Sequence, residues 1–203
     1  WTNHPRSRPA GHPPNRSSGY SSAGNYAAHV EGPLVGREPE LARLDAWLSE
    51  AHGARPEARV VLVSGEAGVG KTRLVLAATA RVDARQQPVA VGRTTEQDGA
   101  PPFWPWRQIL GRLDGPDLLE RGHGDDPEAE RFRRFEDITA WLVAAARAAG
   151  GAVVVLEDAH RADAASLRLL VHVATRLQSE PLALVVTHRS DVSDHAPSFA
   201  TAL

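Results

Sequence analysis

Four short apolar runs, rich in β-branched residues, recur along the chain at residues 58–64, 88–93, 152–160 and 181–189. Their central parts do not alternate between apolar and polar positions, which is typical of parallel strands buried on both faces of a sheet. Segments with helical periodicity separate the runs. Strands that alternate with helices in this way predict a doubly wound α/β fold, with a parallel sheet, flanking helices and right-handed crossovers.

Helical segments are indicated by apolar residues that recur every three or four positions. The stripes expected to face the core are Leu41, Leu44 and Leu48; Leu74, Ala77 and Ala78; Trp106, Ile109, Leu110 and Leu113; and Phe132, Phe135, Ile138, Leu142 and Ala145. Pro105 and Asp126 are good starts for the last two helices. A further helix is expected from about Asp163 to Leu177, and the aromatic cluster PFWPW is expected to pack in the core.

Residues 1–33 are rich in Pro, Gly, Ser, Asn and His and have no periodic apolar pattern, so they predict a disordered leader before an ordered domain at residues 34–203. The chain begins at Trp1 and contains no methionine, which indicates a segment of a longer protein. A formal net charge of -2 gives no basic footprint for nucleic acid or a membrane surface. The absence of cysteine excludes disulfides and thiolate metal sites, and a cytoplasmic location is expected.

The stretch GEAGVGKT, at residues 65–72, joins the first predicted strand to a helical segment. It fits the P-loop pattern, in which glycines let backbone N–H groups approach the phosphates of ATP. The expected phosphate-binding residues are Gly65, Glu66, Ala67, Gly68, Val69, Gly70, Lys71 and Thr72, with the Thr72 hydroxyl also on Mg²⁺. Lys71 is the only lysine among the 23 lysines and arginines, at a position where the planar fork of arginine fits poorly. A glycine-rich turn with an incidental lysine is the alternative.

Two adjacent carboxylates, Glu157 and Asp158, follow the third apolar run, at the strand end where ligands sit in open α/β sheets. Glu157 is placed to hold Mg²⁺ through water, and Asp158 to orient or deprotonate the attacking water. Arg189, at the end of the fourth run, could sense the γ-phosphate. The alternatives are loop acids and a surface arginine. A metal site that includes His160 and Asp163 is not favoured, because no second nitrogen or sulfur ligand is near, and His160 is expected to hydrogen-bond locally.

The motifs LVGREPELARL, GEAGVGKT, VVVLEDAHRADAASLRLL and VVTHR, in this order, resemble the ATPase domain of STAND-type regulators. These are AAA+-related P-loop ATPases found in large LuxR-type transcriptional activators and in some cyclases. GAPPFWPWRQIL also resembles a segment common in bacterial members. The likeness covers residues 34 to about 195. Two positions depart from the family: Glu157 stands where many relatives have aspartate, and Arg161 where a tryptophan is frequent.

The resemblance implies that Val35, Gly36 and Arg37 lie near the adenine or ribose, that the carboxylate pair is the Walker B pair, and that Arg189 is a sensor-like arginine. It also implies the sheet order 5-1-4-3-2. Because only four strands are recognisable, we expect the segment to stop before the fifth strand, the lid subdomain and any effector domain.

The function implied by the resemblance is an ATP-binding, ATP-hydrolysing regulatory switch domain that uses ATP and Mg²⁺ and releases ADP. DNA would be contacted only through a domain outside this segment, no membrane partner is expected, and nucleotide-dependent self-association stays open. A P-loop enzyme, such as a small-molecule kinase or a mechanical ATPase, is the first alternative. A nucleotide-binding scaffold without turnover is the second. The VGRE motif and the carboxylate pair favour the regulatory switch.

Overall fold

The computed structural model describes residues 34, 36–51, 59–94, 100–120, 126–177 and 179–190. These residues contain four strands: β1 (Arg59–Gly65), β2 (Val89–Arg93), β3 (Ala152–Glu157) and β4 (Leu182–Arg189). The strands form one parallel sheet in the order β1-β4-β3-β2. The predicted α/β class is therefore confirmed. The order agrees with the last four positions of the implied order 5-1-4-3-2, and the fifth strand has no counterpart among the described residues.

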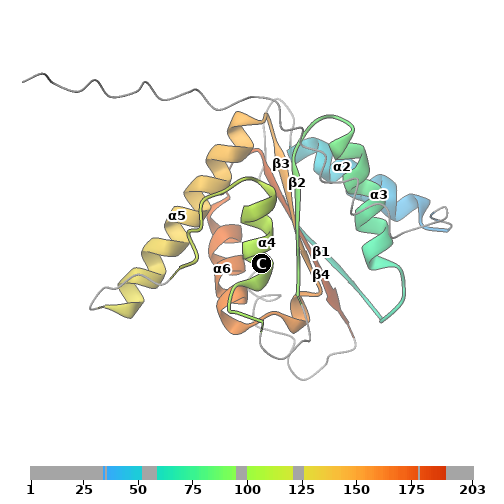
Figure 1. Ribbon diagram of the computed structural model, residues 1–203. Helices are drawn as coiled ribbons and strands as arrows, with labels where there is room; N and C mark the ends of the chain where they lie inside the picture. The colour runs from blue at the N-terminus through green and yellow to red at the C-terminus, as the bar shows by residue number, and fades with distance from the viewer. Residues whose placement is uncertain are drawn as a thin grey trace, which may run out of the picture.

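Five α-helices flank the sheet: α2 (Glu38–Ala51), α3 (Lys71–Asp83), α4 (Trp104–Arg112), α5 (Pro127–Ala148) and α6 (Ala164–Arg176). In Figure 1 the sheet is seen nearly edge-on, with α2 and α3 covering one face and α4, α5 and α6 covering the other. Aspartates cap two of these helices, because the side chains of Asp126 and Asp163 accept hydrogen bonds from the first free backbone N–H groups of α5 and α6.

The hydrophobic core has two parts, one on each face of the sheet. Along β3, Val153 and Val155 pack with α2 and α3, whereas Val154 and Leu156 pack with α4, α5 and α6. Every residue of β3 is buried, as the unbroken apolar run predicts. Each fully buried side chain of this size stabilises the fold by about 1.5–3 kcal/mol. The carboxyl ends of the strands are thereby held in place at one edge of the sheet.

Helix α4 packs unusually close to β2. A Cβ atom at Gly92 would lie only 2.2 Å from the carbonyl oxygen of Pro105, so the absence of a side chain at Gly92 permits the contact. Trp106 is fully buried here and donates a hydrogen bond from Nε1 to the Ser166 carbonyl at 3.0 Å. The prediction that the PFWPW cluster packs in the core is confirmed for Phe103 and Trp106, whereas Trp104 is 39% exposed.

Two sequence predictions are wrong in detail. Strand β3 ends at Glu157 rather than at residue 160, because Asp158 adopts a left-handed conformation (φ 54°) and starts a 3₁₀ turn, η1 (Ala159–Arg161). Phe132 is 53% exposed instead of lying in the core. The first turns of the 22-residue helix α5 extend beyond the sheet (Figure 1), and there the Phe132 ring makes a T-shaped contact with His172 and lies near the guanidinium of Arg176, both on α6.

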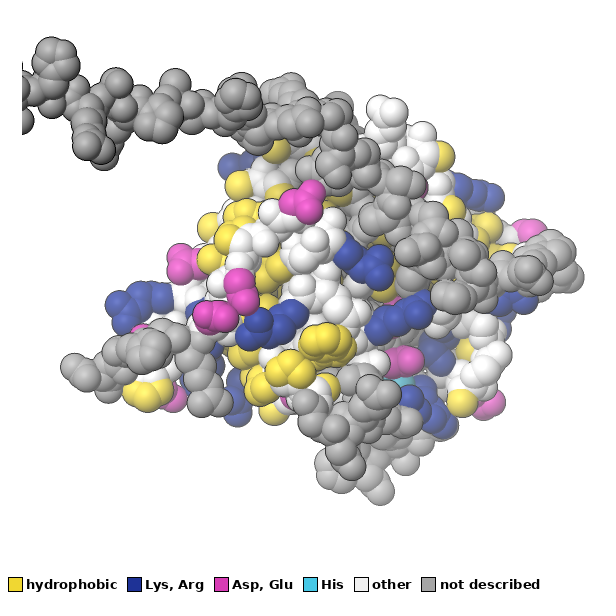
Figure 2. Space-filling model, viewed as in Figure 1, with side chains coloured by type: hydrophobic (Ala, Val, Ile, Leu, Met, Phe, Trp, Pro, Cys, Tyr) yellow, Lys and Arg dark blue, Asp and Glu magenta, His cyan; other side chains and the backbone are white. Residues whose placement is uncertain are grey.

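Neither sign of charge dominates the face of the molecule that Figure 2 shows. Among the side chains coloured in Figure 2, basic and acidic groups are interspersed over this face of the molecule. No helix within the described ranges is long and apolar enough to span a bilayer.

Candidate functional site

The loop between β1 and α3 has the backbone geometry that its glycines predicted. Gly68 and Gly70 have φ angles of +74° and +94°, which side chains with a Cβ rarely adopt. Gly70 is the N-cap of α3 and makes no side-chain cap, so the N–H groups of the first helical turn stay available to an anion. The loop therefore presents a helix N-terminus and backbone donors at the carboxyl edge of the sheet.

The side chain of Lys71 is held in place by backbone carbonyl groups at the start of this loop. Its Nζ donates hydrogen bonds to the carbonyl oxygens of Gly65 and Glu66, both at 2.8 Å. A three-donor ammonium can make two such bonds and keep a third direction for a ligand oxygen. The planar guanidinium of arginine is too broad for that arrangement, which gives a physical reason for the single lysine of the chain.

A cavity of about 380 Å³ lies beside the loop. The loop side of its wall is formed by Ala67, Gly68, Gly70, Lys71, Thr72 and Arg73. The other side is formed by Asp158, His160, Arg161 and Arg189. Arg189 is brought there because β1 and β4 are neighbours in the sheet, with Arg189 in register with Gly65. The structure thus brings together Lys71, Thr72, Asp158 and Arg189, although Lys71 and Arg189 lie 118 residues apart in the sequence.

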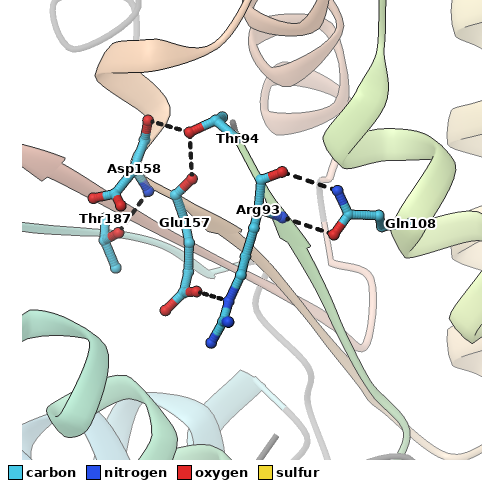
Figure 3. Close-up of polar contacts among 6 residues, drawn as sticks. All are labelled: Arg93, Thr94, Gln108, Glu157, Asp158 and Thr187. Atoms are coloured by element: carbon cyan, nitrogen blue, oxygen red, sulfur yellow. Dashed lines mark hydrogen bonds and ion pairs between the residues drawn. The ribbon is translucent and has the colours of Figure 1, made fainter. Parts of the chain in front are cut away.

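Glu157 does not line this cavity, although the sequence paired it with Asp158. It is buried, and its Oε2 accepts a hydrogen bond from Nε of Arg93 at 2.6 Å (Figure 3). The two residues end neighbouring strands in direct register, on the face that α3 covers. Sequence reasoning missed Arg93, and the only available signal was its position at the end of the second apolar run.

Two threonines, also unassigned from the sequence, fix the turn that carries the carboxylates. Thr94 Oγ1 donates to the carbonyl oxygens of Glu157 at 3.3 Å and Asp158 at 2.9 Å. The N–H of Asp158 donates to Oγ1 of Thr187, a buried residue of β4, at 2.9 Å (Figure 3). These bonds hold Asp158 in its left-handed conformation and direct its side chain to the cavity wall.

A second groove, of about 320 Å³, adjoins the other side of the loop. It is lined by residues of β1 and α2, including the partly exposed Trp47, and by Arg37, which precedes α2, and it shares Gly70 and Lys71 with the first cavity. Arg37 also donates from Nη2 to the Val69 carbonyl at 3.1 Å, which ties the VGRE segment to the loop. Gly36 is exposed beside it, and Val35 lies outside the described residues.

The residues present fit a magnesium–phosphate ligand. Within the described ranges no group of three or more His, Asp or Glu side chains could hold a metal ion, and Mg²⁺ that binds with a nucleotide needs only one or two protein oxygens. The second carboxylate oxygen of Glu157, Oε1, is buried with no hydrogen-bond partner among the described residues, and so is available to an ordered water or cation shell.

Both carboxylate oxygens of Asp163, in contrast, accept hydrogen bonds from groups within the protein. Its oxygens accept hydrogen bonds from the N–H groups of Phe103, Ala165 and Ser166 and from the Ser166 hydroxyl. It therefore fastens α4 to the start of α6.

Comparisons with solved structures show a similar fold. The chain is similar in structure to the Aeropyrum pernix ORC2 protein in its ADPNP–ADP complexes, with 17% identity and a TM-score of 0.53 over 88% of this chain and 49% of that one. It is also similar to the A. pernix ORC1 protein in complex with DNA (20% identity, TM-score 0.47, 84% and 42% covered) and to Rhizobiales Trip13 (17%, 0.45, 86% and 60%). The chain thus spans about half the length of the ORC proteins that it matches.

A search of curated proteins gave no match. The AAA ATPase domain family matches residues 33–186, which is most of the chain and includes the loop, the carboxylate pair and the first five residues of β4, but not Arg189. With its four parallel strands, its phosphate-binding loop and this match, the chain belongs to the AAA ATPase domain family.

Proposed function

We propose that this domain binds ATP with Mg²⁺, hydrolyses it, and serves as the nucleotide-dependent switch of a larger signalling or transcriptional regulator. One observation carries the proposal: Lys71, Asp158 and Arg189, from three separate segments, line one cavity beside a loop of backbone donors. A phosphate chain needs cations and N–H groups, and its hydrolysis needs a carboxylate nearby. The cavity supplies both.

The nucleotide would extend over both the cavity and the groove. Its phosphates suit the 380 Å³ cavity, and its base and ribose suit the 320 Å³ groove, since the two share Gly70 and Lys71. Arg37 of the VGRE segment and Trp47 would then face the nucleoside. This agrees with the role that the family resemblance implies for Val35, Gly36 and Arg37.

Within the phosphate cavity, Lys71 and the N–H groups from Gly68 to Thr72 would bind the phosphate oxygens. Thr72 and Glu157 would hold Mg²⁺, which neutralises phosphate charge when bound. Asp158 would orient the attacking water and take its proton as the terminal P–O bond breaks. Arg189 would contact the γ-phosphate and distinguish ATP from ADP.

The regulatory part of the proposal rests on the sequence resemblance to STAND-type domains of large LuxR-type regulators. Arg37 ties the segment that precedes α2 to the loop, so a change in loop contacts could be passed to the flanking chain. DNA binding would belong to a domain outside this segment. Nucleotide-dependent self-association is a further expectation for such a switch.

The proposal is tested by isothermal calorimetry of Mg-ATP binding to the 203-residue chain. Lys71→Ala should lower ATP affinity on the order of a hundredfold, since charge-assisted hydrogen bonds of about 1.5–3 kcal/mol are lost. Lys71→Arg should rescue little of it. Arg133→Ala, which removes an exposed positive charge on α5, is the matched control and should bind like wild type.

Equal affinities for ATP in wild type and Lys71→Ala would overturn the assignment of the loop. If the wild-type chain does bind ATP through the loop, an assay of the reaction products separates the regulatory ATPase from the two alternative functions. Binding without any phosphate release or ADP formation favours a nucleotide-binding scaffold, whereas ADP formation that requires an added small-molecule acceptor, without release of free phosphate, favours a kinase.

A further inference from the structure

His160 is a residue of the phosphate cavity to which the proposed function gives no role. It lies in the η1 turn, two residues after Asp158, and its side chain forms part of the cavity wall together with Lys71 and Arg189. The sequence predicted that this histidine would hydrogen-bond locally. The structure contradicts that prediction among the described residues.

Both ring nitrogens of His160, Nδ1 and Nε2, are buried and have no hydrogen-bond partner within the described ranges. A neutral imidazole carries one donor and one acceptor, and leaving either unpaired when buried costs about 1–3 kcal/mol. Native proteins seldom leave such groups unpaired. Because the side chain lines the cavity, a ligand bound in the cavity can supply the missing partner.

The charges around His160 define what kind of contact it can make. Burial is the main reason that the pKa of His160 lies below its ordinary value of 6.5; Asp158 raises this pKa, and Arg161, Arg189 and Lys71 lower it further. The lowered pKa favours the uncharged ring at neutral pH. An uncharged N–H donor can bind a phosphate oxygen in a cavity already rich in cations without adding to their mutual repulsion.

We propose that His160 is a ligand-contacting residue that donates a hydrogen bond to the terminal phosphate of a bound nucleoside triphosphate. The inference rests on the proposed function, because it takes the cavity to be the phosphate site. The terminal phosphate is the part of the ligand concerned, since His160 lies in the η1 turn that follows Asp158 and contacts β4, the strand that ends at Arg189, and the proposed function assigns both of these residues to that phosphate. His160 would thus make ATP affinity exceed ADP affinity.

The test compares the affinities of a non-hydrolysable ATP analogue and of ADP, both with Mg²⁺, by calorimetry. His160→Ala should bind the ATP analogue roughly ten- to a hundredfold more weakly, the loss expected for a hydrogen bond to a charged group. Its affinity for ADP should stay within about twofold of wild type. His160→Gln, which keeps an N–H donor, should recover part of the loss. His172→Ala on α6 is the matched control and should change neither affinity.

A second measurement needs no variant and covers the case in which His160→Ala fails to fold. In wild-type protein labelled with ¹⁵N-histidine, the imidazole signals of His160 should shift on saturation with the ATP analogue and stay nearly unmoved with ADP. The His172 signals should respond to neither ligand.

An unchanged ratio of ATP-analogue to ADP affinity in His160→Ala, or imidazole signals that ignore the ATP analogue, would overturn the role of His160 while leaving the proposed function intact. If wild type binds neither nucleotide, the proposed function itself is wrong and the inference is lost with it.

Discussion

Arg93 and Glu157, which end the neighbouring strands β2 and β3, form an ion pair with 2.6 Å between Nε and Oε2. The Glu157 side chain is only 5% exposed, whereas that of Arg93 is 45% exposed, so the guanidinium covers a buried carboxylate from the solvent side. One carboxylate oxygen is thus paired within the protein, and the other has no partner among the described residues. This arrangement distinguishes Glu157 from Asp158, whose side chain lines the cavity.

The first prediction concerns this pair. Arg93→Gln should lower the free energy of unfolding by about 1–3 kcal/mol, because it leaves a buried carboxylate without its cation. Arg147→Gln is the matched control: it breaks a contact of the same 2.6 Å length to Glu180, but Arg147 is 63% exposed, and less than about 1 kcal/mol should be lost. Urea unfolding measures both. A loss in Arg93→Gln no larger than in Arg147→Gln would show that the ion pair is not needed for stability.

The second prediction separates the two carboxylates. Asp158→Asn should keep Mg-ATP affinity and lower phosphate release by at least a hundredfold, because an amide keeps the shape but cannot accept the proton. Glu157→Gln should instead reduce the difference between ATP affinities measured with and without Mg²⁺. Calorimetry with and without EDTA, together with a phosphate-release assay, measures both effects. Wild-type turnover in Asp158→Asn would remove its catalytic role.

The third prediction concerns the core beneath the site. Trp106→Ala should cost about 3–5 kcal/mol of stability, since it empties a fully buried position and removes the bond to the Ser166 carbonyl. Trp104→Ala, two residues away and 39% exposed, should change stability by about 0.5 kcal/mol or less. Thermal unfolding in parallel tests the contrast. Similar losses in the two variants would contradict the packing of α4.

The fourth prediction follows from the pKa of His160. Burial lowers this pKa most; Asp158 raises it, and Arg161, Arg189 and Lys71 lower it further. A folded pKa below 6.5 means that the folded chain binds fewer protons than the unfolded chain, so stability present above pH 6.5 is lost as the pH falls below it. His160→Asn, which cannot titrate, should lose less stability than wild type on acidification through this range. The melting temperatures of wild type and His160→Asn are compared from about pH 7.5 to 5.5. Equal decreases in the two proteins would contradict the prediction.

Much of the fold could be predicted from the sequence because its signals are local. Unbroken apolar runs mark β1, β3 and β4 to within a few residues, and the spacing of Leu44 and Leu48 or of Ile109 and Leu110 correctly marks buried helix faces. The phosphate-binding loop is also local: its glycines and Lys71 are adjacent in the chain, and the backbone turn follows from them. The strand order, in contrast, was expected only from the family resemblance and not from the pattern itself.

Only the tertiary structure decided which groups meet. Arg93 and Glu157 are 64 residues apart, and their contact exists because β2 and β3 pair in one particular register. Phe132 has the helical spacing of a core residue, yet it is exposed because α5 is longer than the surface that it covers. Whether His160 finds a local partner depends on where the η1 turn aims its ring, which a left-handed Asp158 determines. Periodicity in the sequence indicates which face of a helix or strand is buried. Strand register, the extension of a helix beyond the sheet and the geometry of a turn depend on contacts between elements, and those contacts determine which side chains meet in the site.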